Sequence, residues 1–163
     1  MANCRKCSTP LEVGHKPHAI HVDEQPFDTG MYQKAVGSIV YTALGTQPDI
    51  TYAISVLGQY TAQPSSPHRE AIKHLLCYLR GTCGYKLTLY DPRLQHDSNS
   101  IVCYADIDLG GEADSRKPTS GMIIFGLGIL VLWRSKKQTL VAQSTMQTKM
   151  IATANGKVQL DWL

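Results

Sequence analysis

The sequence predicts an α+β fold in which a three-helix unit precedes an antiparallel meander of three or four strands and one C-terminal helix. Before residue 84, apolar residues recur at helical spacing between proline and glycine breakers. After residue 84 they alternate as in half-buried strands, until a helical pattern returns near residue 144. We therefore expect an irregular tail or linker at 1–29, a helical unit at 30–83 and a second unit at 84–163.

Three helices are expected in the first part. The first, residues 32–44, ends before Gly45, a typical C-terminal glycine. The second runs from Pro48 to about residue 60, where Pro64 stops it. The third opens at Ser66-Pro67 with an N-cap and a proline in the first turn. Its apolar stripe consists of Ile72, Leu75, Leu76 and Leu79, and Gly81 closes it.

The second part is expected to begin with strands at 85–90 and 100–105. A hairpin follows from strands at 121–125 and 129–134, joined by Gly126-Leu-Gly128, and 139–142 is a candidate short strand. Ser144-x-x-Gln147 has the form of a capping box and predicts the start of the last helix. The face expected to be buried on that helix carries Ile151, Ala154, Val158 and Trp162.

Composition restricts the function classes. The chain has 163 residues, 43% hydrophobic and 18% charged, with a net charge of +3, which fits a globular protein and leaves nucleic-acid binding open. No apolar run is long enough to span a bilayer, and no apolar core follows the N-terminus, so neither a membrane partner nor a signal peptide is expected.

The five cysteines are odd in number and irregular in spacing, which favours reduced thiols. Cys4-x-x-Cys7 followed by His15, His18 and His21 has the composition of a zinc site. The gap between the pair and the histidines is short, and prolines interrupt it. We therefore predict an irregular tail here, with no metal and no cofactor.

Several motifs resemble copia-type retrotransposon polyproteins in content and order. They are Tyr104-Ala-Asp-Ile-Asp108, Arg116-Lys-Pro-Thr-Ser-Gly121, Trp133-Arg-Ser-Lys-Lys-Gln138 and Ser144-Thr145, which resemble the ribonuclease H portion. Residues 32–50 and 71–82 resemble the end of the reverse transcriptase and its connection to ribonuclease H. The resemblance implies a truncated ribonuclease H-like region at 84–163, and it places the polymerase's catalytic aspartates outside this chain.

The same resemblance implies that the chemistry is lost. Ribonuclease H activity uses two divalent cations held by carboxylates. Asp106 matches the family's first aspartate, with Asp108 beside it, but the family's glutamates fall on Gln147 and Lys149. An ammonium group at 149 repels metal ions, and the chain stops at Leu163, before the next carboxylate is expected. We therefore expect no catalytic residues and no enzyme activity.

Two charged clusters are candidate binding sites. Arg134, Lys136 and Lys137 beside Trp133 are expected to bind nucleic acid weakly, the alternative being ordinary exposed charges at a strand end. The acidic residues Asp106, Asp108, Glu112 and Asp114 faintly resemble a calcium loop. Because Lys117 occupies the place of the bidentate acid, a solvated loop is favoured.

The strand at 100–105 is expected to be an unpaired edge, because the complete ribonuclease H arrangement would place a further strand beside it. Exposed apolar edges pair with other chains. We therefore expect self-association through this strand, or capture of a partner's strand.

The chain as a whole also resembles a member of the secreted RxLR-type effectors of plant-pathogenic oomycetes. This implies a non-enzymatic virulence protein that is secreted, enters the host nucleus or cytoplasm and suppresses plant defence cell death through an unknown host protein. The sequence lacks Arg-x-Leu-Arg, the nearest string being Tyr78-Leu79-Arg80. The alternative is a non-functional, cytoplasmic polyprotein relic with weak nucleic-acid binding.

Overall fold

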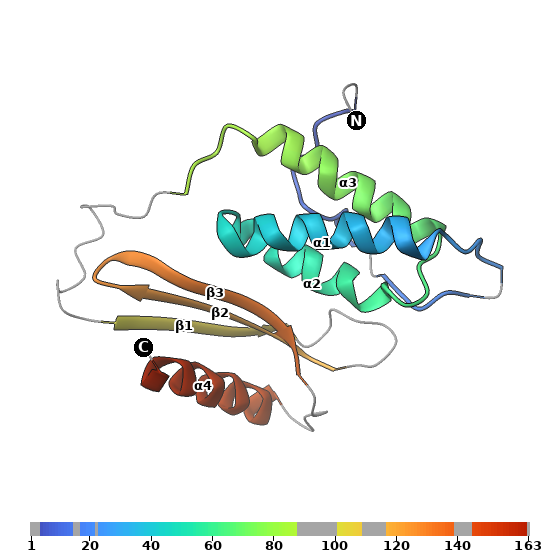
Figure 1. Ribbon diagram of the computed structural model, residues 1–163. Helices are drawn as coiled ribbons and strands as arrows, with labels where there is room; N and C mark the ends of the chain where they lie inside the picture. The colour runs from blue at the N-terminus through green and yellow to red at the C-terminus, as the bar shows by residue number, and fades with distance from the viewer. Residues whose placement is uncertain are drawn as a thin grey trace. The chain divides into compact units, whose positions relative to one another are not determined.

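The computed structural model describes residues 4–14, 17–21, 23–87, 101–108, 117–138 and 145–162. The chain divides into two compact units, Met1–Lys86 and Leu87–Leu163. In the described residues the first unit is helical, and the second contains an antiparallel sheet and a helix (Figure 1). The α+β class expected from the sequence is therefore confirmed.

The helical unit contains three α-helices, and short 3-10 turns extend the second helix at both ends. The elements are α1 (Thr29–Gly45), η1 (Pro48–Ile50), α2 (Thr51–Leu57), η2 (Gly58–Tyr60) and α3 (Ser66–Thr82). Asp28 caps α1, since its side chain accepts a hydrogen bond from the backbone N–H of Met31 at 2.9 Å. The helix therefore begins three residues before the predicted start.

The sequence predicts Ser66 as the N-cap of α3. In the structure the N-cap is Ser65. The backbone N–H of Ser65 donates to Nδ1 of His68 at 3.0 Å, and the Ser65 hydroxyl lies 2.8 Å from the same nitrogen. This is a capping box in which a histidine takes the place of the usual glutamate or glutamine. The sequence signal was missed because histidine is not the residue expected there.

The core of this unit lies where α1, α2 and α3 meet. Its buried members are Tyr32, Val36, Ile39, Ala43, Ile50, Ala53, Ile54, Leu57, Ala71, Ile72, Leu75 and Tyr78. The predicted stripe of α3 is confirmed for Ile72 and Leu75, while Leu76 and Leu79 are only partly buried. Tyr32, 1% exposed, donates its hydroxyl hydrogen to the carbonyl of Leu57 at 2.9 Å, so the polar end of this core residue is satisfied.

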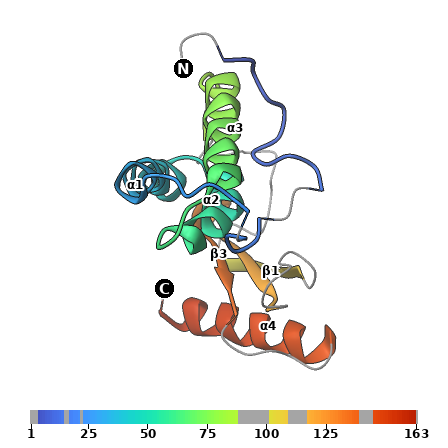
Figure 2. The same ribbon diagram turned by 90° about the vertical axis from the view of Figure 1, so that its right-hand side faces the viewer.

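The described part of the N-terminal segment has no helix and no named strand, yet it packs on the helices. Figure 2 shows its trace beside α3. The hydroxyl of Tyr60 donates to the carbonyl of Pro17 at 2.8 Å, and Phe27 N donates to Pro64 O at 2.9 Å. These contacts between distant parts of the chain hold the segment against the helical core.

The second unit contains a three-stranded antiparallel sheet in the order β1-β2-β3. Its strands are β1 (Ile101–Asp108), β2 (Thr119–Gly126) and β3 (Ile129–Lys137). Leu127 and Gly128, both with positive φ, form the tight turn of the β2–β3 hairpin. In the described part of the chain β1 pairs only with β2, so it is an edge strand as expected. Of the strand expected at 85–90, the described residues 85–87 are not in a strand, and the rest lies outside the described residues, as does the strand expected at 139–142.

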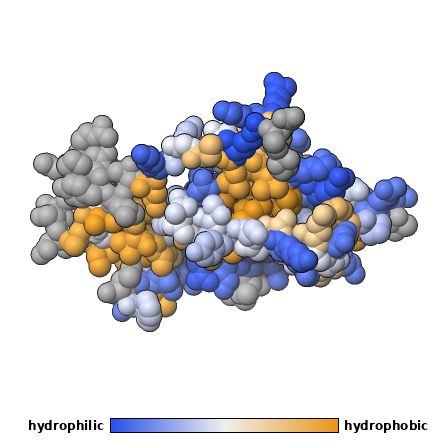
Figure 3. All heavy atoms as spheres, turned by 45° about the horizontal axis from the view of Figure 1, so that its top comes forward, coloured by the Kyte–Doolittle hydropathy of each residue, from blue (hydrophilic) through white to orange (hydrophobic). Residues whose placement is uncertain are grey.

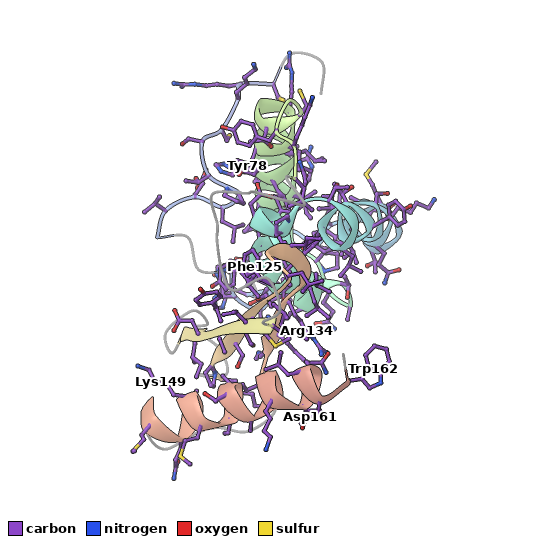
Figure 4. The ribbon with its side chains drawn as sticks, turned by 90° about the vertical axis from the view of Figure 1, so that its left-hand side faces the viewer. Tyr78, Phe125, Arg134, Lys149, Asp161 and Trp162 are labelled. Atoms are coloured by element: carbon purple, nitrogen blue, oxygen red, sulfur yellow. The ribbon has the colours of Figure 1, made fainter. Side chains whose placement is uncertain are left out.

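Helix α4 (Thr145–Trp162) packs on one face of the sheet (Figure 1). Its buried positions are Thr148, Ala152 and Gly156, spaced four residues apart. The predicted face was wrong: Val158 is 62% exposed, Trp162 is 85% exposed, and Figure 4 shows Trp162 pointing outward at the end of the helix. Small residues face the sheet because the helix approaches it closely. A Cβ added at Gly156 would lie 3.1 Å from Sγ of Cys103.

The opposite face of the sheet is apolar near the hairpin turn (Figure 3). Ile123 is 40% exposed and Val131 is 47% exposed on β2 and β3. Tyr104 of β1 lies directly opposite Ile123, and its ring meets that of Phe125 edge to face at 6.1 Å between centroids. The sheet thus carries one face packed on α4 and one apolar, partly exposed face.

Candidate functional site

A cavity of about 320 Å³ lies between the sheet and α4 in the second unit. Three cations from the end of β3, Arg134, Lys136 and Lys137, line it. The amide side chains of Asn155 and Gln159 enter from α4. None of the described residues that line the cavity is acidic, so its potential is positive and suits an anionic ligand.

Strand register explains how the cations reach this cavity. Arg134 lies opposite Met122, which is buried against α4, and Lys136 lies two residues further along β3. Residues two apart in a strand share a face. Figure 4 shows Arg134 over the C-terminal half of α4. The basic end of the strand therefore projects beside the helix, and Lys137 contributes from the rim.

Gln138 is a lining residue whose role the sequence analysis did not assign. It is 7% exposed, and its Nε2 donates to Oγ of Ser120 at 2.7 Å. The same nitrogen lies 3.5 Å from the carbonyl oxygen of Thr148, which connects the strand end to α4. Its Oε1 is buried and has no hydrogen-bond partner in the part of the chain that the structure describes. A buried acceptor of this kind is available to an N–H or O–H group of a ligand in the cavity.

Trp133 does not share the cavity with the cations. It lies opposite Ile123 in the β2–β3 ladder, whereas Arg134 lies opposite Met122. Neighbouring residues of a strand point to opposite faces, so the Trp133 ring belongs to the face of the sheet away from α4. The expected pairing of an aromatic ring with the basic cluster in one groove is therefore wrong.

Asp106, which the resemblance matches to the family's first aspartate, does not line the cavity. Asp106 is exposed, and its Oδ1 accepts a hydrogen bond from the N–H of Ile107 at 2.8 Å. Cys103 meets Gly156 of α4, so strand alternation directs Asp106, three residues later, to the opposite face. Asp108 ends β1, and its side chain is outside the described set, as are Glu112 and Asp114.

Lys149 is exposed on the N-terminal part of α4, away from Arg134 (Figure 4). Neither Lys149 nor Asp106 lines the cavity. Among the described residues, no three or more histidines, cysteines or acids are grouped so that they could hold a metal ion. Among the described residues, the structure thus brings together Arg134, Lys136 and Lys137, and it places neither Asp106 nor Lys149 in the lining of their cavity.

The described cysteines and histidines of the N-terminal segment do not form the constellation suggested by their spacing. Nε2 of His18 lies 2.8 Å from Oε1 of Glu24, and its ring contacts that of His21 at a tilt of 35°, with 4.5 Å between centroids. Sγ of Cys7 instead lies 3.7 Å from Nδ1 of His74, a residue of α3. His15 is outside the described residues.

The curated relatives of the chain include retrotransposon Pol polyproteins and an oomycete protein. The chain is 35% identical over its whole length to the retrovirus-related Pol polyprotein from transposon TNT 1-94 of Nicotiana tabacum, and 31% identical to that from transposon RE2 of Arabidopsis thaliana. It spans only 12% and 11% of those polyproteins. Over 81% of its length it is 36% identical to the secreted RxLR effector protein 161 of Plasmopara viticola, of which it covers 90%.

Other comparisons limit what can be inherited from relatives. No protein-family model matches the chain, and no solved structure matches it. In the described parts of the chain, none of the helices has the length and apolar character needed to cross a membrane. The relatives nevertheless include retrovirus-related Pol polyproteins matched over the whole chain, and another relative is covered to 90% at 36% identity. The chain therefore belongs to the family of copia-type retrotransposon Pol polyproteins.

Proposed function

We propose that this chain is a copia-derived, ribonuclease H-like protein that lacks hydrolytic activity and binds the backbone of nucleic acid weakly. The observation that carries the proposal is the cationic cavity beside α4. Arg134, Lys136 and Lys137 present positive charge to it, and none of its described lining residues offers an opposing carboxylate. Phosphate groups are the ligands that such clusters bind in a nucleic acid, without regard to sequence.

The lack of hydrolysis is supported by the residues at the family's catalytic positions. Lys149 and Gln147 stand where the resemblance places glutamates. Asp106 belongs to the face of the sheet away from the cavity, so a backbone held by the cations does not meet it. Two-metal hydrolysis needs several carboxylates around one phosphate, and this arrangement does not supply them.

Binding is tested by the salt dependence of affinity for a short, labelled RNA:DNA hybrid duplex. Lys136→Gln should reduce the steepness of the plot of log affinity against log salt by about 0.9, the value for one phosphate contact on a duplex. Lys157→Gln is the matched control, because it removes the same charge from an exposed position of α4 outside the cavity lining. Equal effects of the two variants, or no effect of either, would refute the assignment of this cavity.

Hydrolysis is tested with the same duplex and Mg²⁺ or Mn²⁺. We expect no cleavage by the purified protein and no rescue by Lys149→Glu alone, because a single restored carboxylate does not build a two-metal site. Metal-dependent cleavage that Asp106→Ala abolishes would overturn the proposal. The two assays are independent, since binding through the cations does not require a metal.

The second candidate function rests on the oomycete relative, whose printed name describes a secreted RxLR effector. On this proposal the chain is a non-enzymatic secreted protein that acts in the host cell and suppresses plant defence cell death. Expression inside plant cells should then reduce cell death triggered by an unrelated elicitor, and Asp106→Asn should leave the effect intact. Unchanged cell death would leave the nucleic-acid proposal as the only candidate.

A further inference from the structure

Residues 4–9 lie on the C-terminal half of α3. A guanidinium nitrogen of Arg80 donates to the carbonyl of Cys4 at 2.8 Å, and Nε2 of His74 lies 2.9 Å from the carbonyl oxygen of Thr9. The approach is close at Gly81, where an added Cβ would lie 3.3 Å from a backbone oxygen of this segment. The segment is thus fixed to the helix at two points one helical turn or more apart.

Cys77 lies between these two points and interacts with the thiols of Cys4 and Cys7. Residues three apart on a helix lie on one side of it, so Cys77 lies between His74 and Arg80. Sγ of Cys4 lies 3.7 Å from a guanidinium nitrogen of Arg80, and Sγ of Cys7 lies 3.7 Å from Nδ1 of His74. Cys77 therefore faces both thiols of the N-terminal segment and interacts with each of them.

The environment distinguishes the two sulfur atoms. A hydrogen bond from Cys77 and the charge of Arg80 lower the pKa of the Cys4 thiol. The hydrogen bond to Cys4, together with partial desolvation, raises the pKa of Cys77 to about 11. The thiolate is the nucleophilic form of cysteine. Cys4 is accordingly the nucleophile of the pair, and Cys77 is the thiol that keeps its proton.

We propose that Cys4 and Cys77 are a redox-reactive dithiol that a hydroperoxide oxidises to a disulfide, tying the N-terminal segment to α3. Both cysteines are free and partly exposed, so an oxidant can reach them. A metal site is the less favoured alternative, because the described residues contain no group of three or more ligands arranged to hold an ion.

The reaction balances in two steps. The Cys4 thiolate attacks one peroxide oxygen, so that an S–O bond forms, the O–O bond breaks, and the leaving hydroxide is protonated to water. The sulfur of Cys77 then attacks the sulfur of Cys4. The S–S bond forms, the S–O bond breaks, and the hydroxide leaves as water with the Cys77 proton. Two thiols and one hydrogen peroxide give one disulfide and two water molecules.

The pairing is read by tryptic digestion of the full chain without reduction, after treatment with hydrogen peroxide. Cleavage after Arg5 and Lys6 separates Cys4 from Cys7, and cleavage after Lys73 and Arg80 releases Cys77 in its own peptide. We expect the peptide of residues 1–5 linked to that of residues 74–80. The disulfide closes a loop of 73 residues (77 − 4). It should therefore raise the melting temperature of the helical unit by at least about 5 °C.

Variants test the roles of the residues. Cys77→Ser should abolish the link and the rise in melting temperature, whereas Cys83→Ser, which removes an exposed thiol at the end of α3, should preserve both. Arg80→Met should move the pH of half-maximal oxidation rate upward, and Arg80→Lys should restore it, because the cation favours the thiolate. The rescue separates an electrostatic role of Arg80 from a merely structural one.

Three outcomes would overturn the proposal. The first is oxidation that yields only links between different chains through Cys83. The second is oxidation that proceeds equally fast in the unfolded protein, which would show that the folded surroundings of Cys4 do not increase its reactivity. The third is purified protein that carries stoichiometric zinc protecting Cys4 and Cys77 from peroxide, since the cluster would then be a metal site and not a redox pair.

Discussion

His68 connects the cap of α3 to the N-terminal segment, and its replacement should destabilise the helical unit. The side chain is 2% exposed. Its Nδ1 accepts from Ser65 N–H, so the ring proton is on Nε2, which donates to the carbonyl of His18 at 2.9 Å. Tyr60 stacks on the ring at 4.2 Å between centroids. Leucine at this position would keep the volume and remove all three interactions.

The magnitude follows from the groups left unpaired. Ser65 is fully buried, so its orphaned N–H costs about 1–3 kcal/mol, and the partly buried His18 carbonyl adds about 1 kcal/mol. We therefore expect His68→Leu to lower the free energy of unfolding by about 2–4 kcal/mol. The measurement is urea unfolding of the full chain, monitored by the helical circular dichroism signal.

His68→Gln is the matched variant for this prediction. Glutamine is the usual partner in a capping box, so its side-chain oxygen should again accept from Ser65 N–H and recover at least about 1 kcal/mol of the loss. It does not replace the ring's contact with Tyr60. A loss below about 1 kcal/mol in His68→Leu, or no recovery in His68→Gln, would show that the cap does not depend on this side chain.

Three further predictions concern packing, pH and association. Gly156→Val should destabilise the second unit by about 1–3 kcal/mol, because an added Cβ would lie 3.1 Å from the sulfur of Cys103 on β1. The measurement is unfolding followed by tryptophan fluorescence, and Ala154→Val, at an exposed position of the same helix, should not destabilise the unit. A hydrogen bond from Ser65 lowers the pKa of Glu24. The stability that the Glu24 carboxylate contributes is therefore present above about pH 4.3 and is lost as the pH falls through the lowered pKa. Glu24→Gln should reduce this loss of stability at acid pH, as measured by unfolding at a series of pH values. Val102→Lys on the edge strand should abolish any self-association seen by sedimentation while the helical signal persists; unchanged association would move the contact to another surface.

Much of the fold could be predicted because its signals are local. Proline and glycine punctuation located the helices, and apolar alternation located β2 and β3. The prediction of the buried face of α4 was wrong for a physical reason. The buried residues Thr148, Ala152 and Gly156 are only weakly hydrophobic, so the pattern of large apolar residues points to exposed positions instead. Burial of small residues reflects close approach of the sheet, which the periodicity of one segment does not encode.

The partners of the N-terminal cysteines also could not be predicted from the neighbouring sequence. The spacing Cys4-x-x-Cys7 suggests a site completed by the nearest histidines. The segment instead contacts α3, about 70 residues later in the sequence. Two of those histidines serve other contacts, and His74 and Cys77 take their place. The signal in the sequence was the pair of three-residue spacings, Cys4 to Cys7 and His74 to Cys77, read together.

The cationic cavity arises from two features, the basic end of β3 and the small buried residues of α4, neither of which alone indicates a binding site. A basic strand end is common on protein surfaces, and a stripe of small residues on a helix usually reports only tight packing. Here the small stripe brings α4 close to β1 and β2, so the long side chains of Arg134 and Lys136 cannot pass beneath the helix and instead line its side with Asn155. Affinity for a nucleic-acid backbone should therefore fall when Gly156 is enlarged, although Gly156 is not among the residues that line the cavity.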